Sequence, residues 1–223
     1  MRLKSDYIVF QNEIAARGID CLVHFTPTIN LLGIFEQNKI LSRKILEENN
    51  TDLLDYTEFT DDIRFDDKNY INLSIQSPNS FLFSKFREKT RSESHIFWCV
   101  LKIDKKYIYY SDTLFSITNA ANSYNKRNIG VTGGIDKFRM MFASSLKVVT
   151  SYGEKKISRN NLKPKYPTDE QAEVLVKDEI LLSDILQVCF RNKDELAKTK
   201  AALIDYTTDN FVVDTSLFTN ARI

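Results

Sequence analysis

The sequence predicts a single α+β domain spanning residues 1–223. Short apolar runs rich in β-branched and aromatic residues are bounded by turn residues, which is typical of strands. Stretches with apolar residues at helical spacing lie between these runs and predict flanking helices. The chain has 223 residues, 43% of them hydrophobic, which is enough to bury a core without disulfides or metals. No internal repeat or low-complexity tract divides it, so we expect one packed unit.

The N-terminal part predicts a helix, a strand and a second helix. Residues 5–16 carry apolar side chains at helical spacing and are followed by Gly18, a typical helix end. Residues 21–25 form a short apolar run that favours a buried strand. The Thr-Pro-Thr segment 26–28 favours a helix entry with one of its threonines as N-cap, and a helix is predicted over residues 29–37.

The rest of the chain predicts five strands separated by loops and short helices. These strands span residues 70–75, 95–103, 107–110, 172–176 and 185–190. The acidic stretch up to Asp67 and the polar residues 119–134 predict loops. A helical turn is predicted over residues 81–86. Asn192, followed by a glutamate three residues later, forms a capping-box pattern that opens a helix through residue 204.

The charge of the chain is balanced overall but unevenly distributed. The formal net charge is only +1, which by itself argues against a strong attraction to nucleic acid. However, acidic residues dominate between Leu46 and Asn69, and basic residues dominate between Lys126 and Lys165. A basic segment of this kind either attracts polyanions or forms an ordinary solvated surface.

Composition also excludes several classes of protein. Three cysteines at scattered positions, Cys21, Cys99 and Cys189, favour buried free thiols in a reducing compartment. No secretory signal or apolar stretch long enough for a membrane span is present, so we expect a cytoplasmic protein. With six glycines and two histidines, the chain has no dinucleotide-binding or P-loop motif and no metal-ligand spacing. We therefore expect no metal.

Three polar motifs lie at the ends of predicted strands. The first is His24-Phe25-Thr26 followed by Asn30-Leu31, in which a histidine ends an apolar strand and needs a hydrogen-bond partner. The second is Asn72-Leu73-Ser74 running into residues 77–79. Each has an ordinary structural explanation, a satisfied buried histidine for the first and turn chemistry for the second.

The third motif places a carboxylate on an apolar strand. Glu173 lies between Ala172 and Val174 in the run 171–176. An ionised carboxylate there is costly unless it is paired or used chemically, although the same pattern fits a glutamate that faces solvent.

In their order these motifs resemble the DarT family of ADP-ribosyltransferases. The resemblance covers about residues 20–190 and is most specific at residues 171–176. It implies an ADP-ribosyltransferase-like fold with split central β-sheets and flanking helices. It also implies NAD⁺ as the substrate that donates ADP-ribose.

The resemblance assigns roles to individual residues. Glu173 would be the catalytic carboxylate, hydrogen-bonded to the ribose that carries nicotinamide. His24 and Thr26 would hold the ribose and phosphate half of NAD⁺, supported by Asn30 and Leu31. Ser74 would line the nicotinamide pocket, and Arg64 would contact an NAD⁺ phosphate or the incoming base.

The same resemblance implies a nucleic-acid substrate. The segment 151–168 interleaves aromatic and basic residues, a composition that suits a single strand with stacked bases. The residues expected to contact it are Tyr152, Lys155, Lys156, Arg159, Lys163 and Lys165. The second motif lacks the aromatic residues of the thymidine-modifying members and is closer to the guanine-modifying branch. The expected substrate is therefore a guanine base of single-stranded DNA.

The family also implies a biological role. A base-modifying enzyme would be poisonous, so we expect the toxin half of a toxin–antitoxin pair for phage defence, with a macrodomain antitoxin. Alternatives are a transferase acting on RNA or protein, and a non-catalytic nucleic-acid-binding domain in which Glu173 is structural. Gln171 stands where many arginine-directed transferases carry a second acid, which weakens the protein-directed alternative.

Overall fold

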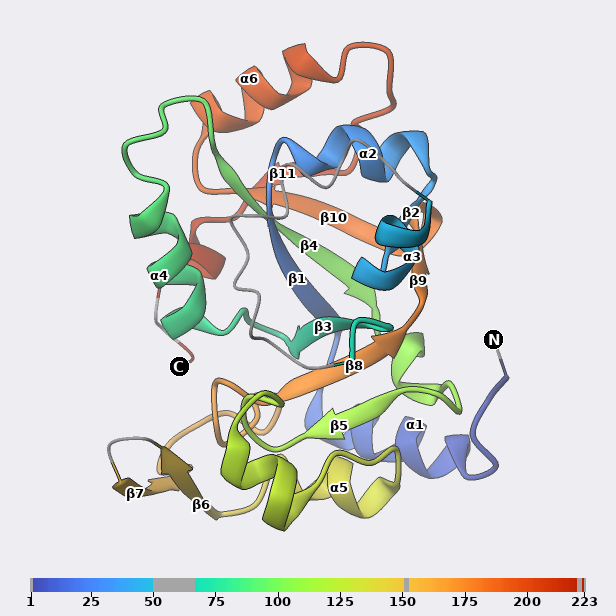
Figure 1. Ribbon diagram of the computed structural model, residues 1–223, viewed down its shortest axis with the longest axis vertical. Helices are drawn as coiled ribbons and strands as arrows, with labels where there is room; N and C mark the ends of the chain where they lie inside the picture. Colours follow the sequence, from blue (N-terminus) through green and yellow to red (C-terminus); the bar gives the residue numbers. More distant parts are fainter. Residues whose placement is uncertain (1, 50–66, 151–152, 220–221, 223) are drawn as a thin grey trace.

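The computed structural model describes residues 2–49, 67–150, 153–219 and 222. Its central sheet consists of β1 (Cys21–Pro27), β3 (Tyr70–Ile75), β4 (Trp98–Asp104), β5 (Leu114–Ser116), β8 (Glu173–Lys177), β10 (Ile185–Phe190) and β11 (Phe211–Val213). The seven strands follow the order β11-β10-β4-β1-β3-β8-β5. Helices flank this sheet (Figure 1), which confirms the predicted α+β class.

The sheet is split into two parts that meet at β1 and β3. These strands pair antiparallel where Leu22 lies opposite Ile75 and Val23 opposite Ser74. β1 then runs along β4 for its whole length, whereas β3 pairs with β8, and β8 with β5. Figure 1 shows β1 and β3 diverging from this junction. The split arrangement expected from the family resemblance is therefore present.

Helices cover both parts of the sheet. They are α1 (Tyr7–Arg17), α2 (Asn30–Glu36), α3 (Arg43–Glu48), α4 (Ser80–Lys89), α5 (Ile135–Met140) and α6 (Lys193–Ala202). In Figure 1, α2 and α6 lie over the part that contains β1, β4 and β10, and α1 and α5 lie beside the part that contains β5 and β8. Shorter helical turns are η2 (Lys105–Tyr109), η3 (Asn125–Ile129), η4 (Leu182–Asp184) and η5 (Thr215–Phe218).

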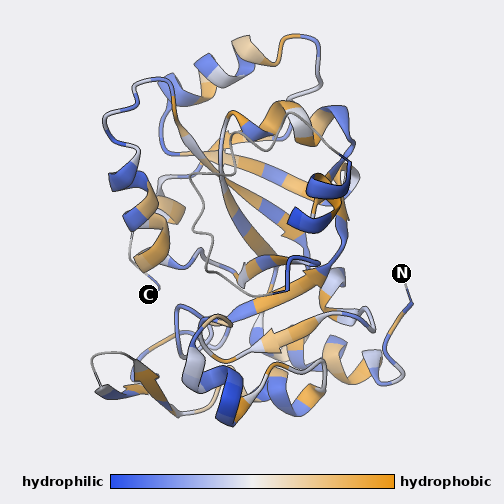
Figure 2. Ribbon diagram, viewed as in Figure 1, coloured by the Kyte–Doolittle hydropathy of each residue, from blue (hydrophilic) through white to orange (hydrophobic). Residues whose placement is uncertain are grey.

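Alternation along β1 separates two apolar cores. Leu22 is fully buried in the larger core, whereas its neighbour Val23 packs with Phe86 and Trp98 beneath α4. Successive side chains of a strand point to opposite faces, so His24 lies on the face of Leu22. Figure 2 shows apolar residues gathered along the strands and polar residues on the outer helix α6.

Most predicted elements are confirmed. The strands over residues 70–75 and 185–190 have the predicted bounds, and α1 ends at Gly18 in a left-handed conformation (φ 67°). The predicted capping box also forms. The Asn192 side chain accepts a hydrogen bond from the Glu195 backbone N–H at 2.9 Å, and its amide donates to the Glu195 carboxylate at 3.1 Å. These elements could be predicted because their sequence signals are local and do not depend on which strands pair in the sheet.

Two local predictions were wrong. Residues 107–110 do not form a strand, because the Asp104 side chain accepts from the Lys106 N–H at 2.7 Å and starts the 3₁₀ helix η2. Neither threonine of the 26–28 segment caps α2, whose N-cap position is occupied by Ile29. The Thr26 hydroxyl instead accepts a hydrogen bond from the Asn30 side chain at 2.9 Å.

One segment expected to be a loop, and the basic segment expected to contact nucleic acid, contain regular elements. The polar segment 119–134 contains the π-helical turn η3, and the segment 151–168 contains the strand β7 (Gly153–Ser158). β7 pairs with β6 (Ser145–Thr150) in a hairpin that projects at the lower left of Figure 1. A second small sheet joins β2 (Lys39–Leu41) to β9 (Glu179–Leu181). None of the described helices is both long and apolar enough to traverse a bilayer.

Candidate active site

Glu173 is a buried carboxylate at the first position of β8. The residue is only 5% exposed. One carboxylate oxygen accepts a hydrogen bond from the backbone N–H of Ala120 at 2.6 Å, and the other accepts from the Asn72 side-chain amide at 3.1 Å. Charge-assisted bonds of this kind offset part of the cost of burying an ionised group. The glutamate is therefore not the solvent-facing residue that the sequence left open.

Asn72 connects this carboxylate to His24. Its side chain extends from β3 toward β8, where the register places Asn72 opposite Leu175. Its backbone carbonyl lies 3.0 Å from His24 Nδ1. A carbonyl can only accept, so this contact makes Nδ1 the protonated nitrogen of the ring and leaves Nε2 as its other polar atom. His24, Asn72 and Glu173 thus form a polar chain across β1, β3 and β8, where the sheet splits.

The loop after β5 presents the Ala120 N–H to the carboxylate. Asn119 shapes this loop, because its side chain accepts from the Ala121 N–H at 2.8 Å. Asn122 then ties the loop to the hairpin, donating from its side-chain amide to the Val149 carbonyl at 2.9 Å. The hairpin is therefore anchored to the loop that holds Glu173.

The other residues predicted to bind NAD⁺ lie on β1, α2 and β3. Thr26 is 5% exposed and is paired with Asn30, as described above, at the end of β1. Ser74 is 8% exposed, two positions from Asn72, and hence on the same face of β3. The Leu31 side chain is fully buried in the larger core, where it packs α2. Arg64 lies outside the described residues.

A buried polar pair supports β8 from the other side. Ser116 of β5 is paired in register with Glu173, and its hydroxyl accepts from the Asn125 side chain at 2.8 Å. Both residues are fully buried. This pair fixes the strand that flanks the carboxylate.

The predicted nucleic-acid contacts fall into two groups. Lys155, Lys156 and Lys163 are exposed, the first two on β7. Lys165 is partly buried, with its ammonium 5.5 Å from the Tyr166 ring centre. Tyr152 lies outside the described residues.

Arg159 is engaged within the protein. Its guanidinium donates to the backbone carbonyls of Lys163 and Tyr166, each at 2.9 Å, and to the Thr168 hydroxyl at 3.2 Å. These bonds hold together the segment that leads into β8.

Comparison with known proteins identifies the family. The profile described as "ssDNA thymidine ADP-ribosyltransferase, DarT" matches residues 23–217, most of the chain. The chain belongs to the DarT family. As a member it is an NAD⁺-dependent ADP-ribosyltransferase, which confirms the predicted enzyme class and NAD⁺ as substrate. The family acts on single-stranded DNA, and the predicted guanine-modifying branch is not confirmed, because the family description names thymidine.

Solved structures share the fold at low sequence identity. Thermosipho africanus DarTG in complex with ADP-ribose is 15% identical with a TM-score of 0.54, over 89% of this chain and 51% of that one. Thermus sp. 2.9 DarT in complex with ADP-ribosylated ssDNA is 11% identical with a TM-score of 0.52, over 91% and 97%. The same protein in complex with NAD⁺ is 12% identical with a TM-score of 0.52, over 89% and 96%. The chain thus spans about half of the Thermosipho protein. No curated protein sequence matches it.

The sequence motifs missed two groups that hold the Glu173 carboxylate. Asn72 belongs to the second motif but was not assigned a role, and the Ala120 N–H is a backbone group without a sequence signal. A polar residue inside an apolar strand, two positions before Ser74, was the available clue for Asn72. Within the described ranges, no group of three or more His, Cys, Asp or Glu side chains is placed to hold a metal ion.

Proposed function

We propose that the chain transfers ADP-ribose from NAD⁺ to a guanine base of single-stranded DNA, as the toxin half of a toxin–antitoxin pair. The observation that carries the proposal is the buried Glu173 carboxylate, fixed by Asn72 and Ala120 where the sheet splits. A carboxylate held by two donors is preorganised for charge that develops beside it.

The reaction requires a fixed negative group beside the ribose. The bond between the ribose carbon and nicotinamide breaks, nicotinamide leaves, and a nitrogen of the base forms the new bond and loses a proton. The carbon passes through an oxocarbenium-like state, which a nearby carboxylate stabilises. In the proposal Glu173 accepts a hydrogen bond from the ribose hydroxyl and takes the proton of the attacking nitrogen.

The remaining motif residues would position NAD⁺. His24 and Thr26, at the end of β1, would contact the ribose and phosphates, and the hydrogen bond from Asn30 would hold the Thr26 hydroxyl. Ser74 would line the nicotinamide side, since it shares the face of Asn72 on β3. Arg64 would contact a phosphate or the base.

The assignment to guanine rests on the second motif. The segment 72–79 lacks the aromatic-rich stretch that the resemblance leads us to expect in thymidine-modifying members. A polar segment suits a base with several hydrogen-bonding atoms on one edge, as guanine has. Thymidine, which the family description names, is the alternative that base analysis would distinguish.

The single strand would reach the site along the β6–β7 hairpin. Lys155 and Lys156 are exposed on the hairpin, and Lys163 is exposed in the segment that follows it. Asn122 ties the hairpin to the loop that holds Glu173. Exposed lysines contribute salt-dependent contacts to phosphates. A base must leave a duplex to enter a pocket, so single-stranded DNA would be the better substrate. Lys165 and Tyr152 would extend the same contact surface.

The toxin role rests on the likeness to a DarTG protein. The Thermosipho structure is described as DarTG in complex with ADP-ribose, and this chain spans about half of it. We propose that a macrodomain antitoxin removes the ADP-ribose and that the pair serves in phage defence. Co-expression with a macrodomain hydrolase should restore growth of cells that the chain alone arrests.

The transfer is tested with labelled NAD⁺ and separate pools of single-stranded DNA, duplex DNA, RNA and protein. Mass spectrometry of digested products identifies the modified base. Glu173→Ala is the inactive variant, and Asp205→Asn, which removes an exposed carboxylate, is the matched control. Label on guanine of single-stranded DNA, lost only in Glu173→Ala, supports the proposal. Label on thymidine corrects the base, and label on RNA or protein alone overturns the DNA assignment. Strand binding without any transfer would indicate a non-catalytic domain.

A further inference from the structure

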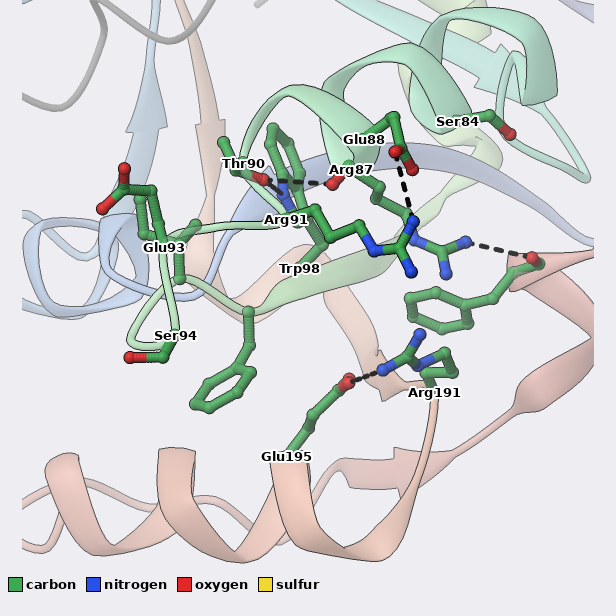
Figure 3. Close-up of a pocket in the computed structure, with 13 residues that line it drawn as sticks. Ser84, Arg87, Glu88, Thr90, Arg91, Glu93, Ser94, Trp98, Arg191 and Glu195 are labelled. Carbon is green, nitrogen blue, oxygen red and sulfur yellow. Dashed lines mark hydrogen bonds and ion pairs between the residues drawn. The ribbon is translucent and has the colours of Figure 1, made fainter.

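A hollow lies beside α4, on the opposite side of β1 from His24. It has a volume of about 520 Å³ and is formed by the C-terminal half of α4, the segment that leads into β4, the start of α6, and η5 (Figure 3). Trp98 at its base packs with Val23, the neighbour of His24 that points to the other face of the sheet. None of the residues that line the hollow belongs to the site around Glu173, so the two are distinct.

Three arginines line this hollow, hereafter the arginine pocket. Arg191 is paired with the buried carboxylate of Glu195 at 2.7 Å. Arg91 contacts Glu88 at 3.3 Å, but both side chains are more than 70% exposed, so this ion pair is weak. Figure 3 shows the side chains of Arg87, Arg91 and Arg191 extending into the same space.

Arg87 differs from its two neighbours in forming no ion pair with any of the described residues. Its guanidinium donates to the Phe218 carbonyl at 3.1 Å and lies 5.4 Å and 5.6 Å from the ring centres of Phe83 and Phe218. Among the described residues, no carboxylate lies within ion-pair distance of it. Since a guanidinium has five N–H donors, most of its capacity is left for a ligand.

The surroundings of Arg87 disfavour its charge when no anion is present. Burial lowers the pKa of Arg87, and the positive charge of Arg191 lowers it further. Glu195, which is paired with Arg191 and bonded to Asn192, opposes this only in part, since the pKa of Arg87 stays lowered. An anion bound between the two guanidinium groups would relieve the repulsion.

Aromatic rings form the remaining wall. Phe97 and Phe218 are partly exposed, and Trp98 is buried with its indole N–H donated to Thr90 at 2.9 Å. Arginine beside aromatic rings is the combination that holds a phosphate and an adjacent base.

Helix α4 links this pocket to the catalytic strand. Its first residue, Ser80, is hydrogen-bonded to Glu170, three residues before Glu173. The helix has 10 residues, so its two ends lie about 15 Å apart. Two exposed lysines, Lys85 and Lys89, continue the positive charge along it.

We propose that the arginine pocket binds a phosphate of the single-stranded DNA substrate, with the flanking base against the aromatic wall. The span of α4 corresponds to roughly three to five nucleotides at the strand rise of 3.4 Å. The ligand chemistry is a nucleotide phosphate, and we assign it to the phosphodiester of the strand rather than to a free mononucleotide. This assignment rests on the proposed DNA substrate.

The test measures binding of a fluorescent 20-nucleotide single strand to Glu173→Ala protein at several salt concentrations. Adding Arg87→Gln should weaken binding about tenfold, as loss of a charged hydrogen-bonding group does, and reduce the salt slope by about 0.7. Arg2→Gln makes the same chemical change at an exposed position in the N-terminal segment and should leave both quantities unchanged. Unchanged affinity and slope in a folded Arg87→Gln variant overturn the proposal.

Three further measurements keep the outcome interpretable. Arg87→Lys keeps the positive charge and most of the aliphatic side chain. Strand affinity between those of the wild type and Arg87→Gln, with an unchanged thermal midpoint of unfolding, supports phosphate binding. In otherwise wild-type protein, Arg87→Gln should lower transfer to the 20-mer but not to a dinucleotide, which is too short to reach the pocket. Adenosine monophosphate binding that needs Arg87, with strand affinity unchanged, overturns the assignment to the strand. If the wild-type chain modifies no DNA, the proposed function fails instead.

Discussion

The junction around Glu173 and the arginine pocket both withdraw a charged side chain from water, but they satisfy it differently. Glu173 receives two hydrogen bonds from donors that belong to the fold. Arg87 donates to one carbonyl and contacts two aromatic rings. A charge satisfied by fixed groups is preorganised before substrate arrives, whereas a charge with spare donors favours the binding of an oppositely charged ligand. The difference predicts that substitutions around Glu173 lower the rate of ADP-ribose transfer, whereas substitutions in the arginine pocket lower the affinity for the DNA strand.

The largest effect is expected at Glu173. Glu173→Gln keeps the shape and can still accept from the Ala120 N–H, but it removes the negative charge. Transfer should fall about a thousandfold, in the range of losing one electrostatic contact in a transition state. Single-turnover rates with saturating NAD⁺ measure this. Retention of more than a tenth of the rate would mean that Glu173 only supports the structure.

Asn72→Ala separates positioning from catalysis. The variant removes the Asn72 donor and keeps the Ala120 N–H on Glu173, and the lost side chain is not expected to touch the reacting atoms. We expect kcat to fall about 30-fold, equivalent to roughly 2 kcal/mol for one lost bond to a charged group. KM for NAD⁺ should change little, and Asn72→Gln should restore part of the rate. An equal loss in Asn72→Gln, or a change confined to KM, would contradict the positioning role.

The contrast between these residues also shows what could be predicted from sequence. β3 and β10 have local patterns, so residues 70–75 and 185–190 were placed correctly, and Glu173 stood out as a charge in an apolar strand. The partner of Glu173 depends on the register of β3 against β8 and on a backbone N–H, which one-dimensional patterns do not encode. For the same reason the 3₁₀ helix at 105–109 was predicted as a strand, because apolar and aromatic composition is shared by both.

Arg159 provides a cation to compare with Arg87. Composition placed it with the DNA-binding lysines, but three hydrogen bonds engage it within the segment 163–168. Arg159→Gln should lower the free energy of unfolding by about 2 kcal/mol, which corresponds to roughly 4–8 °C in Tm for a chain of this size. The affinity of the folded variant for single-stranded DNA should stay within about twofold of the wild-type value, which is less than the loss of one phosphate contact would cause.

Lys163→Gln also removes one positive charge, but we expect it to affect DNA binding rather than stability. The side chain is exposed, so its loss should weaken strand binding and leave Tm unchanged. Thermal unfolding and fluorescence anisotropy on the same preparations compare the two. If Arg159→Gln lowered the affinity for the strand but not Tm, Arg159 would be a DNA-binding residue after all.

The smallest effect is expected at Lys4, a third buried charge. Its ammonium donates to the Thr113 carbonyl at 2.8 Å and lies 5.4 Å from the Phe115 ring centre. Burial lowers its pKa from 10.5 to about 8, against the raising influence of Asp6 and Asp112. Between these two pH values the unfolded chain binds more protons than the folded one, so stability rises with pH.

The size of that rise measures the cost of the buried ammonium. We expect the free energy of unfolding to increase on the order of 1 kcal/mol between pH 8 and 10. Above that window, tyrosines with raised pKa values such as Tyr107 oppose the trend, because they ionise first in the unfolded chain. Urea titrations of the wild type and Lys4→Met at each pH isolate the contribution, since the methionine should flatten the rise. Equal slopes in both proteins would mean that the ammonium remains hydrated.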